Sequence, residues 1–169
     1  VRRLVSEAML KWNAPAPFGG SATLAQALLM PTRIYVKPIL KAVRETGGVK
    51  ALAHITGGGL SENLPRVLPN GFAAHVDLGT WKTPAVFGWL QQRGRLDDAE
   101  MLRTFNCGMG MILVVAKDSA DAVAGLLSAE GENSVRIGEI EPGRGVRSQA
   151  KGKGEAEAVR YSGALEFAG

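Results

Sequence analysis

The sequence predicts an α/β (α+β) domain in which helices pack on a mixed β-sheet. Short apolar runs of strand length alternate along the chain with segments whose apolar residues recur at helical spacing. Glycine and proline separate most of these segments. With 169 residues, of which 46% are apolar, the chain is long enough to bury one compact core. One domain of alternating helices and strands is therefore expected.

The first third of the chain is expected to be mainly helical. Apolar residues recur there every three or four positions, and prolines end the periodic runs. Proline suits the first position of a helix, and glycine suits the position just after its end. In chain order, the expected elements are a helix over Val1–Trp12, a short helix over Thr23–Met30, a strand over Ile34–Val36 and a helix from Pro38 to Gly47.

The rest of the chain alternates strands with helices. Asp97, followed three residues later by Glu100, resembles a capping box, and Asp118 is expected to cap a later helix. Pro65 must lie in the first turn of its helix or kink it. The expected elements are a strand over Ala51–Ile55, a helix over Leu60–Leu68, a strand over Phe72–Leu78, a helix from Thr83 to Gly94, a helix containing Met101 and Leu102, a strand over Gly110–Ala116, a helix containing Ala122 and Leu127, and a strand over Val135–Ile140.

The excess positive charge is concentrated near the C-terminus. The net charge is +4, and the segment from Gly143 to Gly154 holds four basic residues and no acidic one, so the other 16 basic residues balance the 16 acidic ones. This segment has no apolar periodicity. We expect a domain over residues 1–142, a flexible basic loop or tail over 143–157, and a terminal edge strand within 158–169.

Several classes of partner are not expected from this composition. The chain shows no basic face with interleaved aromatic residues, which argues against nucleic acid. No apolar run approaches the ~18–20 residues of a membrane span, so we expect no membrane partner and a cytoplasmic location. The single cysteine, Cys107, cannot form an internal disulfide and offers no metal-ligand spacing. No metal site is expected in this chain.

Three consecutive glycines form the most informative local pattern. Gly57–Gly59 follow the apolar run that ends at Ile55 and precede a predicted helix. Glycines allow close approach of a ligand to the backbone, and the first N–H groups of a helix can hold phosphate. The same three glycines also suit a tight turn that binds nothing, and the pattern alone leaves these two interpretations at even odds.

Two further segments and the residues after the glycine loop change this balance. Pro31–Lys37, Leu64–Pro69 and Arg103–Met111, taken together with Gly57–Gly59, closely resemble the C-terminal domain of AIR synthetase. That enzyme is the phosphoribosylformylglycinamidine cyclo-ligase of purine biosynthesis. The resemblance extends from Val1 to about Gly138 and preserves the order and spacing of the motifs. It implies the fold of that domain, which is distantly ferredoxin-like.

The resemblance implies an ATP-dependent enzyme of two domains, of which this chain is the second. A missing N-terminal domain would be the partner of this chain and would supply much of the ATP-binding apparatus and the dimer interface of a homodimer. A chain that begins at Val1 in a helical pattern is expected to be a fragment, with a multifunctional purine-biosynthesis protein as its expected parent. The substrates would be formylglycinamidine ribonucleotide and ATP, with Mg²⁺. The isolated chain is expected to be inactive and to bind no cofactor tightly.

Two alternatives remain open at this point. The chain could belong to another ATP-dependent enzyme of the AIR-synthetase superfamily, such as formylglycinamidine synthetase, selenophosphate synthetase, thiamine-monophosphate kinase or a hydrogenase-maturation enzyme. These enzymes share the glycine-rich turn but are not expected to carry both Pro31–Lys37 and Arg103–Met111. A noncatalytic domain that binds anions or serves assembly is the second alternative.

The candidate site residues come from the same motifs. His54 and Asn106 are candidates for catalytic roles, although a histidine in a strand is as often a structural residue. Arg33 offers a planar charged group that suits phosphate, and Ser61 and Asn63 are expected to be neutral donors beside the loop. Cys107 is expected to pack rather than to act as a nucleophile. The full set of candidate substrate- or phosphate-binding residues is Thr32, Arg33, Thr56, Gly57, Gly58, Gly59, Ser61 and Asn63.

Overall fold

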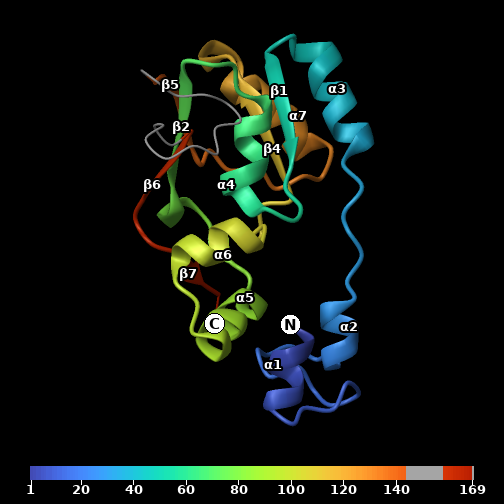
Figure 1. Ribbon diagram of the computed structural model, residues 1–169. Coiled ribbons are helices and arrows are strands. Elements are labelled where there is room, and N and C mark those ends of the chain that lie inside the picture. The colour runs from blue at the N-terminus through green and yellow to red at the C-terminus, as the bar shows by residue number, and fades with distance from the viewer. Residues whose placement is uncertain (144–157, 169) are drawn as a thin grey trace.

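The computed structural model describes residues 1–143 and 158–168, and its elements follow one another as shown in Figure 1. The predicted flexible segment over 143–157 therefore lies, apart from Gly143, outside the described residues. The α-helices are α1 (Arg2–Glu7), α2 (Leu24–Leu28), α3 (Val36–Thr46), α4 (Gly59–Asn63), α5 (Ala85–Gly94), α6 (Asp98–Thr104) and α7 (Ala120–Ala129). The strands are β1 (Val49–His54), β2 (Phe72–Asp77), β3 (Lys82–Thr83), β4 (Met111–Val115), β5 (Gly138–Pro142), β6 (Val159–Ser162) and β7 (Glu166–Phe167).

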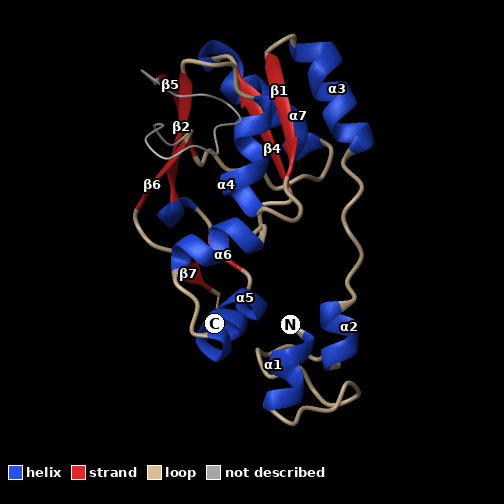
Figure 2. Cartoon of the chain, viewed as in Figure 1, coloured by secondary structure: helices blue, strands red, loops and turns tan. Residues whose placement is uncertain are grey.

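The predicted α/β class with mixed strand directions is confirmed, but among the described residues the strands do not join into one sheet. β1 pairs with β4 in an antiparallel ladder, in which Ala53 lies opposite Ile112. β2 pairs antiparallel with β5 and parallel with β6, which lies at the edge of that sheet. The short strands β3 and β7 form a parallel pair of their own. Figure 2 shows the β1–β4 pair beside α3 and α7, with β2, β5 and β6 on the other side of α4.

The two faces of the β1–β4 pair pack against different layers, because neighbouring residues of a strand point to opposite faces. Ile112 and Val114 belong to the main core, which also contains Leu60 and Leu64. Leu113 and Val115 face a second cluster, formed by α3 and α7. Its fully covered side chains are Ala42, Val123 and Leu127. The main core extends to Ala74 and Val76 of β2 and to Met101 and Leu102 of α6.

The N-terminal helices form a separate layer on α5. Val5 of α1 and Leu24 of α2 are buried against Trp89 and Leu90. Thr23 caps α2 with a complete capping box, in which its hydroxyl accepts from the backbone N–H of Gln26. A long extended connection then leads from α2 to α3 along the outside of the molecule (Figure 1).

Two N-terminal predictions are wrong. The helix expected over Val1–Trp12 ends at Glu7, because the chain turns at Met9, which has a φ of +52° and is 89% exposed. The strand expected over Ile34–Val36 is absent: no described strand lies beside this segment to pair with it, and Val36 already begins α3. Pro38 lies in the first turn of that helix, and Gly47 ends it at φ +61°, as the glycine stop predicts.

Later elements differ from the predictions mainly at their ends. The helix expected over Leu60–Leu68 is divided into α4 and a 3₁₀ turn over Leu64–Val67, because Pro65 cannot donate the backbone hydrogen bond that would continue α4. Asp97 caps α6 as predicted, but the other half of the expected capping box is not formed, because the Glu100 carboxylate accepts from Arg103 and Thr104. Asp118 does not cap α7, because it lies within a 3₁₀ turn before that helix. The strand expected from Val135 begins at Gly138.

The part of the chain that the structure describes contains no helix with the length and apolar character needed to cross a membrane.

Candidate functional site

The glycine loop joins the end of β1 to the start of α4. Gly58 and Gly59 have φ angles of +96° and +56°, which side chains other than that of glycine rarely adopt. A Cβ added at Gly59 would overlap the carbonyl oxygen of Leu102 and lie 2.7 Å from that of Phe105. Gly57 has open space around it and no positive φ. Gly59 is thus required by close packing against the end of α6, whereas Gly57 is free of that constraint.

The side chain of Asn63 holds the glycine loop in its conformation. Its side chain is buried, with 6% exposed, and its amide nitrogen donates to the carbonyl oxygens of Thr56, Gly57 and Gly59 at 3.4, 3.1 and 2.8 Å. Its side-chain oxygen accepts from Arg66 at 3.2 Å. The N–H groups of the Asn63 side chain, which were expected to face a ligand, therefore donate to the loop. The structure gives Asn63 a positioning role.

Two other side chains beside the loop are also engaged. The Ser61 hydroxyl makes a 2.8 Å hydrogen bond with the hydroxyl of Tyr161, which ties α4 to β6. The Glu62 carboxylate lies against Gly58 and is 3.9 Å from the guanidinium of Arg66. A carboxylate at this position repels an anion unless Arg66 or a bound cation offsets its charge. The glycine loop is therefore a turn fixed by hydrogen bonds, with a carboxylate and a guanidinium beside it.

The three motif segments meet at the end of β1. The ring of Tyr35 lies edge-on to that of His54, with 6.2 Å between the ring centres. The Tyr35 hydroxyl also packs directly against Gly110, where an added Cβ would overlap it. The backbone N–H of Ile55 donates to the carbonyl oxygen of Gly110 at 3.0 Å. Tyr35 was not among the predicted site residues, although its place in the first motif was the signal for it.

His54 and Asn106 keep free polar groups at this junction. The side chain of His54 is exposed at the end of β1. The side-chain oxygen of Asn106 accepts from the backbone N–H of Gly108 at 3.1 Å, which fixes the turn. Within the described residues, the Asn106 amide nitrogen has no hydrogen-bond partner. Asn106 can therefore hold its own turn and still donate to a ligand.

Arg33 is paired with the segment that follows α7. Its guanidinium is 2.9 Å from a Glu132 carboxylate oxygen and donates to the carbonyl oxygen of Gly131 at 3.0 Å. The Arg33 side chain is 57% exposed, whereas that of Glu132 is only 16% exposed. A ligand can reach this arginine, but taking it from Glu132 would leave a largely buried carboxylate without its partner. Thr32 is exposed beside it.

A cavity of about 630 Å³ lies along the edge of β4 that does not pair with β1. Its opposite wall is formed by β2 and β5, and most of its lining is apolar. Arg33, Tyr35 and Gly108–Met111 line it, so two of the motif segments form one wall. Its size is in the range of small-molecule sites. Sequence reasoning gave no sign of this cavity, because it arises from the distance between two sheets.

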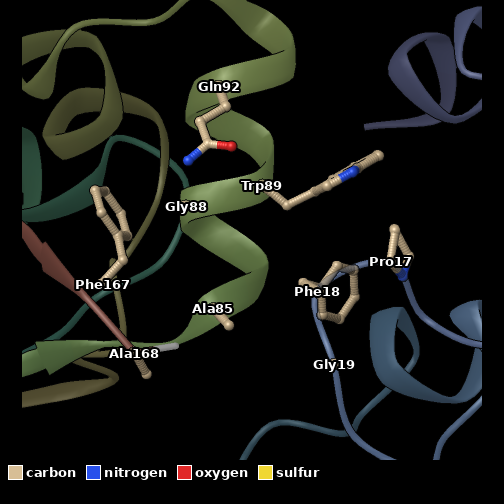
Figure 3. A pocket seen from close by; sticks show the side chains of 9 residues that line it. All are labelled: Pro17, Phe18, Gly19, Ala85, Gly88, Trp89, Gln92, Phe167 and Ala168. Atoms are coloured by element: carbon tan, nitrogen blue, oxygen red, sulfur yellow. The ribbon is translucent and has the colours of Figure 1, made fainter.

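A second cavity, of about 370 Å³, is shown in Figure 3. It is formed by α5, β7 and the loop before α2, and the rings of Phe18 and Trp89, which both line it, contact each other with their centres 6.0 Å apart. Its lining residues are Pro17, Phe18, Gly19, Ala85, Gly88, Trp89, Gln92, Phe167 and Ala168. None of them titrates, so this cavity lacks groups for acid–base chemistry.

Cys107 is a buried packing residue. Burial and, to a smaller extent, the nearby charge of Asp98 raise the pKa of its thiol to about 12. The thiol contacts the carbonyl oxygen of Met101 at 3.6 Å. Because the thiolate is the reactive form, we expect Cys107 to resist a disulfide reagent in the native protein and to react fully in denaturant. Rapid reaction of the native protein, followed by absorbance, would contradict this assignment.

The described residues do not fit a magnesium site of their own. No group of three or more His, Cys, Asp or Glu side chains among them could hold a metal ion together. Magnesium is bound by several oxygen ligands, with carboxylates prominent among them. The absence of a metal site from the chain as a whole stays a prediction.

The fold and its motifs place the chain in a known class. Residues 1–151 match the family described as AIR synthase related protein, C-terminal domain, and the chain belongs to this family. Two crystal structures of HypE from E. coli, one described as a hydrogenase maturation protein, have similar folds. Each is 21% identical to this chain, with TM-scores of 0.54 and 0.56. They cover 86% and 98% of this chain, which spans 45% of each HypE chain.

Proposed function

We propose that this chain is the C-terminal domain of an ATP-dependent cyclo-ligase that converts formylglycinamidine ribonucleotide to aminoimidazole ribonucleotide. The observation that carries the proposal is the convergence of Tyr35, His54 and Gly110 at the end of β1. Tyr35 and Gly110 come from two of the motifs that resemble the cyclo-ligase, and His54 lies three residues before a third, Gly57–Gly59. The exposed ring of His54 lies at this junction, and the partly buried Asn106 lies four residues before Gly110 in the same motif.

The reaction has two steps. In the first, the formyl amide oxygen attacks the terminal phosphorus of ATP, and ADP leaves. In the second, an amidine nitrogen attacks the activated carbon, the five-membered ring closes, and the former amide oxygen leaves as part of phosphate. Such chemistry depends on fixed donors that position charged groups. We assign a donor role to Asn106, a charge-balancing role to Arg33 and a positioning role to Asn63.

The proposal places the remaining apparatus outside this chain. ATP, Mg²⁺ and the dimer interface are assigned to the other part of a longer polypeptide, which the proposal takes to be a homodimer. The share of HypE that this chain covers, 45%, supports a longer polypeptide. We propose that the longer polypeptide is a purine-biosynthesis protein, and that it is multifunctional.

The substrate is tested with the full-length protein. Phosphate release from Mg-ATP is measured with formylglycinamidine ribonucleotide, with formylglycinamide ribonucleotide plus glutamine, with selenide and with thiamine monophosphate. We expect release only with the first. Release with another substrate assigns the chain to a different superfamily enzyme, and release with none, while the ribonucleotide still binds, indicates a noncatalytic domain.

The isolated chain is expected to show no turnover. Phosphate release with ATP, Mg²⁺ and formylglycinamidine ribonucleotide should stay at the level measured without protein, because the proposal places the ATP site elsewhere. The same assay on the full-length protein is the positive control. Clear turnover by the purified 169-residue chain would show that its own residues complete the site.

A further inference from the structure

We infer that the outer face of residues 29–43 is the surface on which the rest of the longer polypeptide docks. This face is named the apolar stripe here and consists of Leu29, Met30, Ile34, Val36, Leu40 and Val43. Met30 and Ile34 are 77% and 81% exposed, and Leu29 is 79% exposed. Large apolar side chains that are exposed singly are ordinary, whereas a contiguous set of them marks an interaction site.

The extended part of the stripe is held from one side only. Arg33 contacts Glu132, and Tyr35 contacts Gly110 and His54. In an extended segment alternate side chains point to opposite sides, so Ile34 faces away from the molecule. Among the described residues, the backbone groups of residues 30–34 make no hydrogen bond. The inner side chains of this segment are therefore fixed by contacts. Its outer side chains and its backbone groups have no packing or hydrogen-bond partner among the described residues.

The stripe continues along α3. Val36, Leu40 and Val43 are spaced by four and three residues, which places them on one helical face. They are exposed, while Ile39 and Ala42, which lie next to them on the same wide apolar face of the helix, are buried. The apolar face of α3 is therefore wider than the part that packs on this domain, and its outer edge is left uncovered among the described residues. Figure 1 shows α3 and the connection before it along one outer side of the molecule.

The charges beside the stripe indicate the chemistry of its partner. Lys37 and Arg44 of α3 are exposed, and within the described residues neither has an ion-pair partner. Lys41 is paired with Glu130, and Glu45 is the acidic residue of this helix. The complementary surface thus has an apolar centre and an acidic rim.

The occupant we assign is a domain of the same polypeptide. This inference rests on the proposed function in one respect, that the chain is part of a longer protein, and the 45% coverage of the HypE chains is its support. A domain joined by the chain itself docks at a high effective concentration, so a modest apolar stripe suffices. A second copy of this chain would instead require association between molecules.

The occupant is identified by photo-crosslinking in the full-length protein. A benzophenone amino acid replaces Ile34 in one variant and Met9 in another, and Met9 is the matched control because it is 89% exposed but lies outside the stripe. We expect the Ile34 variant to crosslink to a peptide outside residues 1–169 of the same polypeptide, without doubling its mass. A crosslink to residues 1–169 of a second copy, or none at all, overturns the inference.

A second measurement tests the contact and its charge. Hydrogen exchange of residues 30–36 is compared in the full-length parent, Ile34→Asp, Ile34→Lys and Met9→Asp. Because the buried face of an isoleucine is lost, we expect exchange in Ile34→Asp to be faster by about tenfold or more. Ile34→Lys should be milder because the rim is acidic, and Met9→Asp should match the parent. Equal exchange in all four proteins would contradict a covered stripe. The assays of ATP turnover do not enter this result, so the two proposals fail separately.

Discussion

Replacement of Gly59 by alanine is expected to lower the free energy of unfolding by about 3 kcal/mol. The new Cβ would overlap the carbonyl oxygen of Leu102 and crowd that of Phe105, and the φ of +56° is unfavourable for alanine. Since both obstacles are backbone atoms, α4 and α6 must move apart. The measurements are urea denaturation and thermal unfolding of the isolated chain, and the midpoint of thermal unfolding should fall by about 6–12 °C.

Gly57→Ala is the matched control for this prediction. No atom lies within 4 Å of a Cβ at Gly57, and its φ is not positive. Its free energy of unfolding should stay within about 0.5 kcal/mol of the parent value. If Gly59→Ala is as stable as Gly57→Ala, the packing of the loop on α6 does not decide the choice of glycine. In that case, a ligand becomes the stronger explanation for the triple glycine.

Asn63→Ala is expected to lower the free energy of unfolding by a similar amount, about 3 kcal/mol. The substitution removes the donor that three loop carbonyl groups share and leaves those groups close to the core. Asn63 is 6% exposed, so water cannot readily replace the amide. Loss of the loop geometry should also reduce the activity of the full-length enzyme. The measurements are urea denaturation and kcat/KM.

Asn106→Ala separates positioning from contact with substrate. Asn106 is only partly buried and makes one hydrogen bond to a turn, so its removal should cost less than about 1 kcal/mol of stability. If its free amide nitrogen donates to the substrate, kcat/KM of the full-length enzyme falls by about tenfold to a hundredfold. A stable Asn106→Ala enzyme with normal kcat/KM would remove Asn106 from the site.

Local signals predicted those parts of the fold that depend on neighbouring residues in the sequence. Gly47 ends α3 and Asp97 caps α6, because both effects act within one helical turn. The strand over Ile34–Val36 failed for the opposite reason. β-branched and aromatic residues indicate a pleated surface, but a strand also needs a neighbour, and its presence depends on distant parts of the chain. The left-handed conformation is adopted by Met9 itself, where no glycine or asparagine indicated a turn.

The candidate site divides in the same way. The motifs indicated His54, Gly57–Gly59 and Asn106 as candidate site residues before any geometry was known. The roles of individual side chains could not be read from the motifs, because their partners are distant in sequence. Arg33 meets Glu132, which lies 99 residues away, and Ser61 meets Tyr161, which lies 100 residues away. The inward direction of the Asn63 amide depends on how the loop folds over it.

Transfer of the formyl oxygen tests the proposed cyclo-ligase function most directly. Formylglycinamidine ribonucleotide labelled with ¹⁸O in the formyl group is incubated with Mg-ATP and the full-length protein, and phosphate and nucleotide products are analysed by mass spectrometry. The proposal predicts one ¹⁸O atom in each phosphate released and an equal amount of aminoimidazole ribonucleotide. Unlabelled phosphate, or no aminoimidazole ribonucleotide from an enzyme that still binds both substrates, would contradict it.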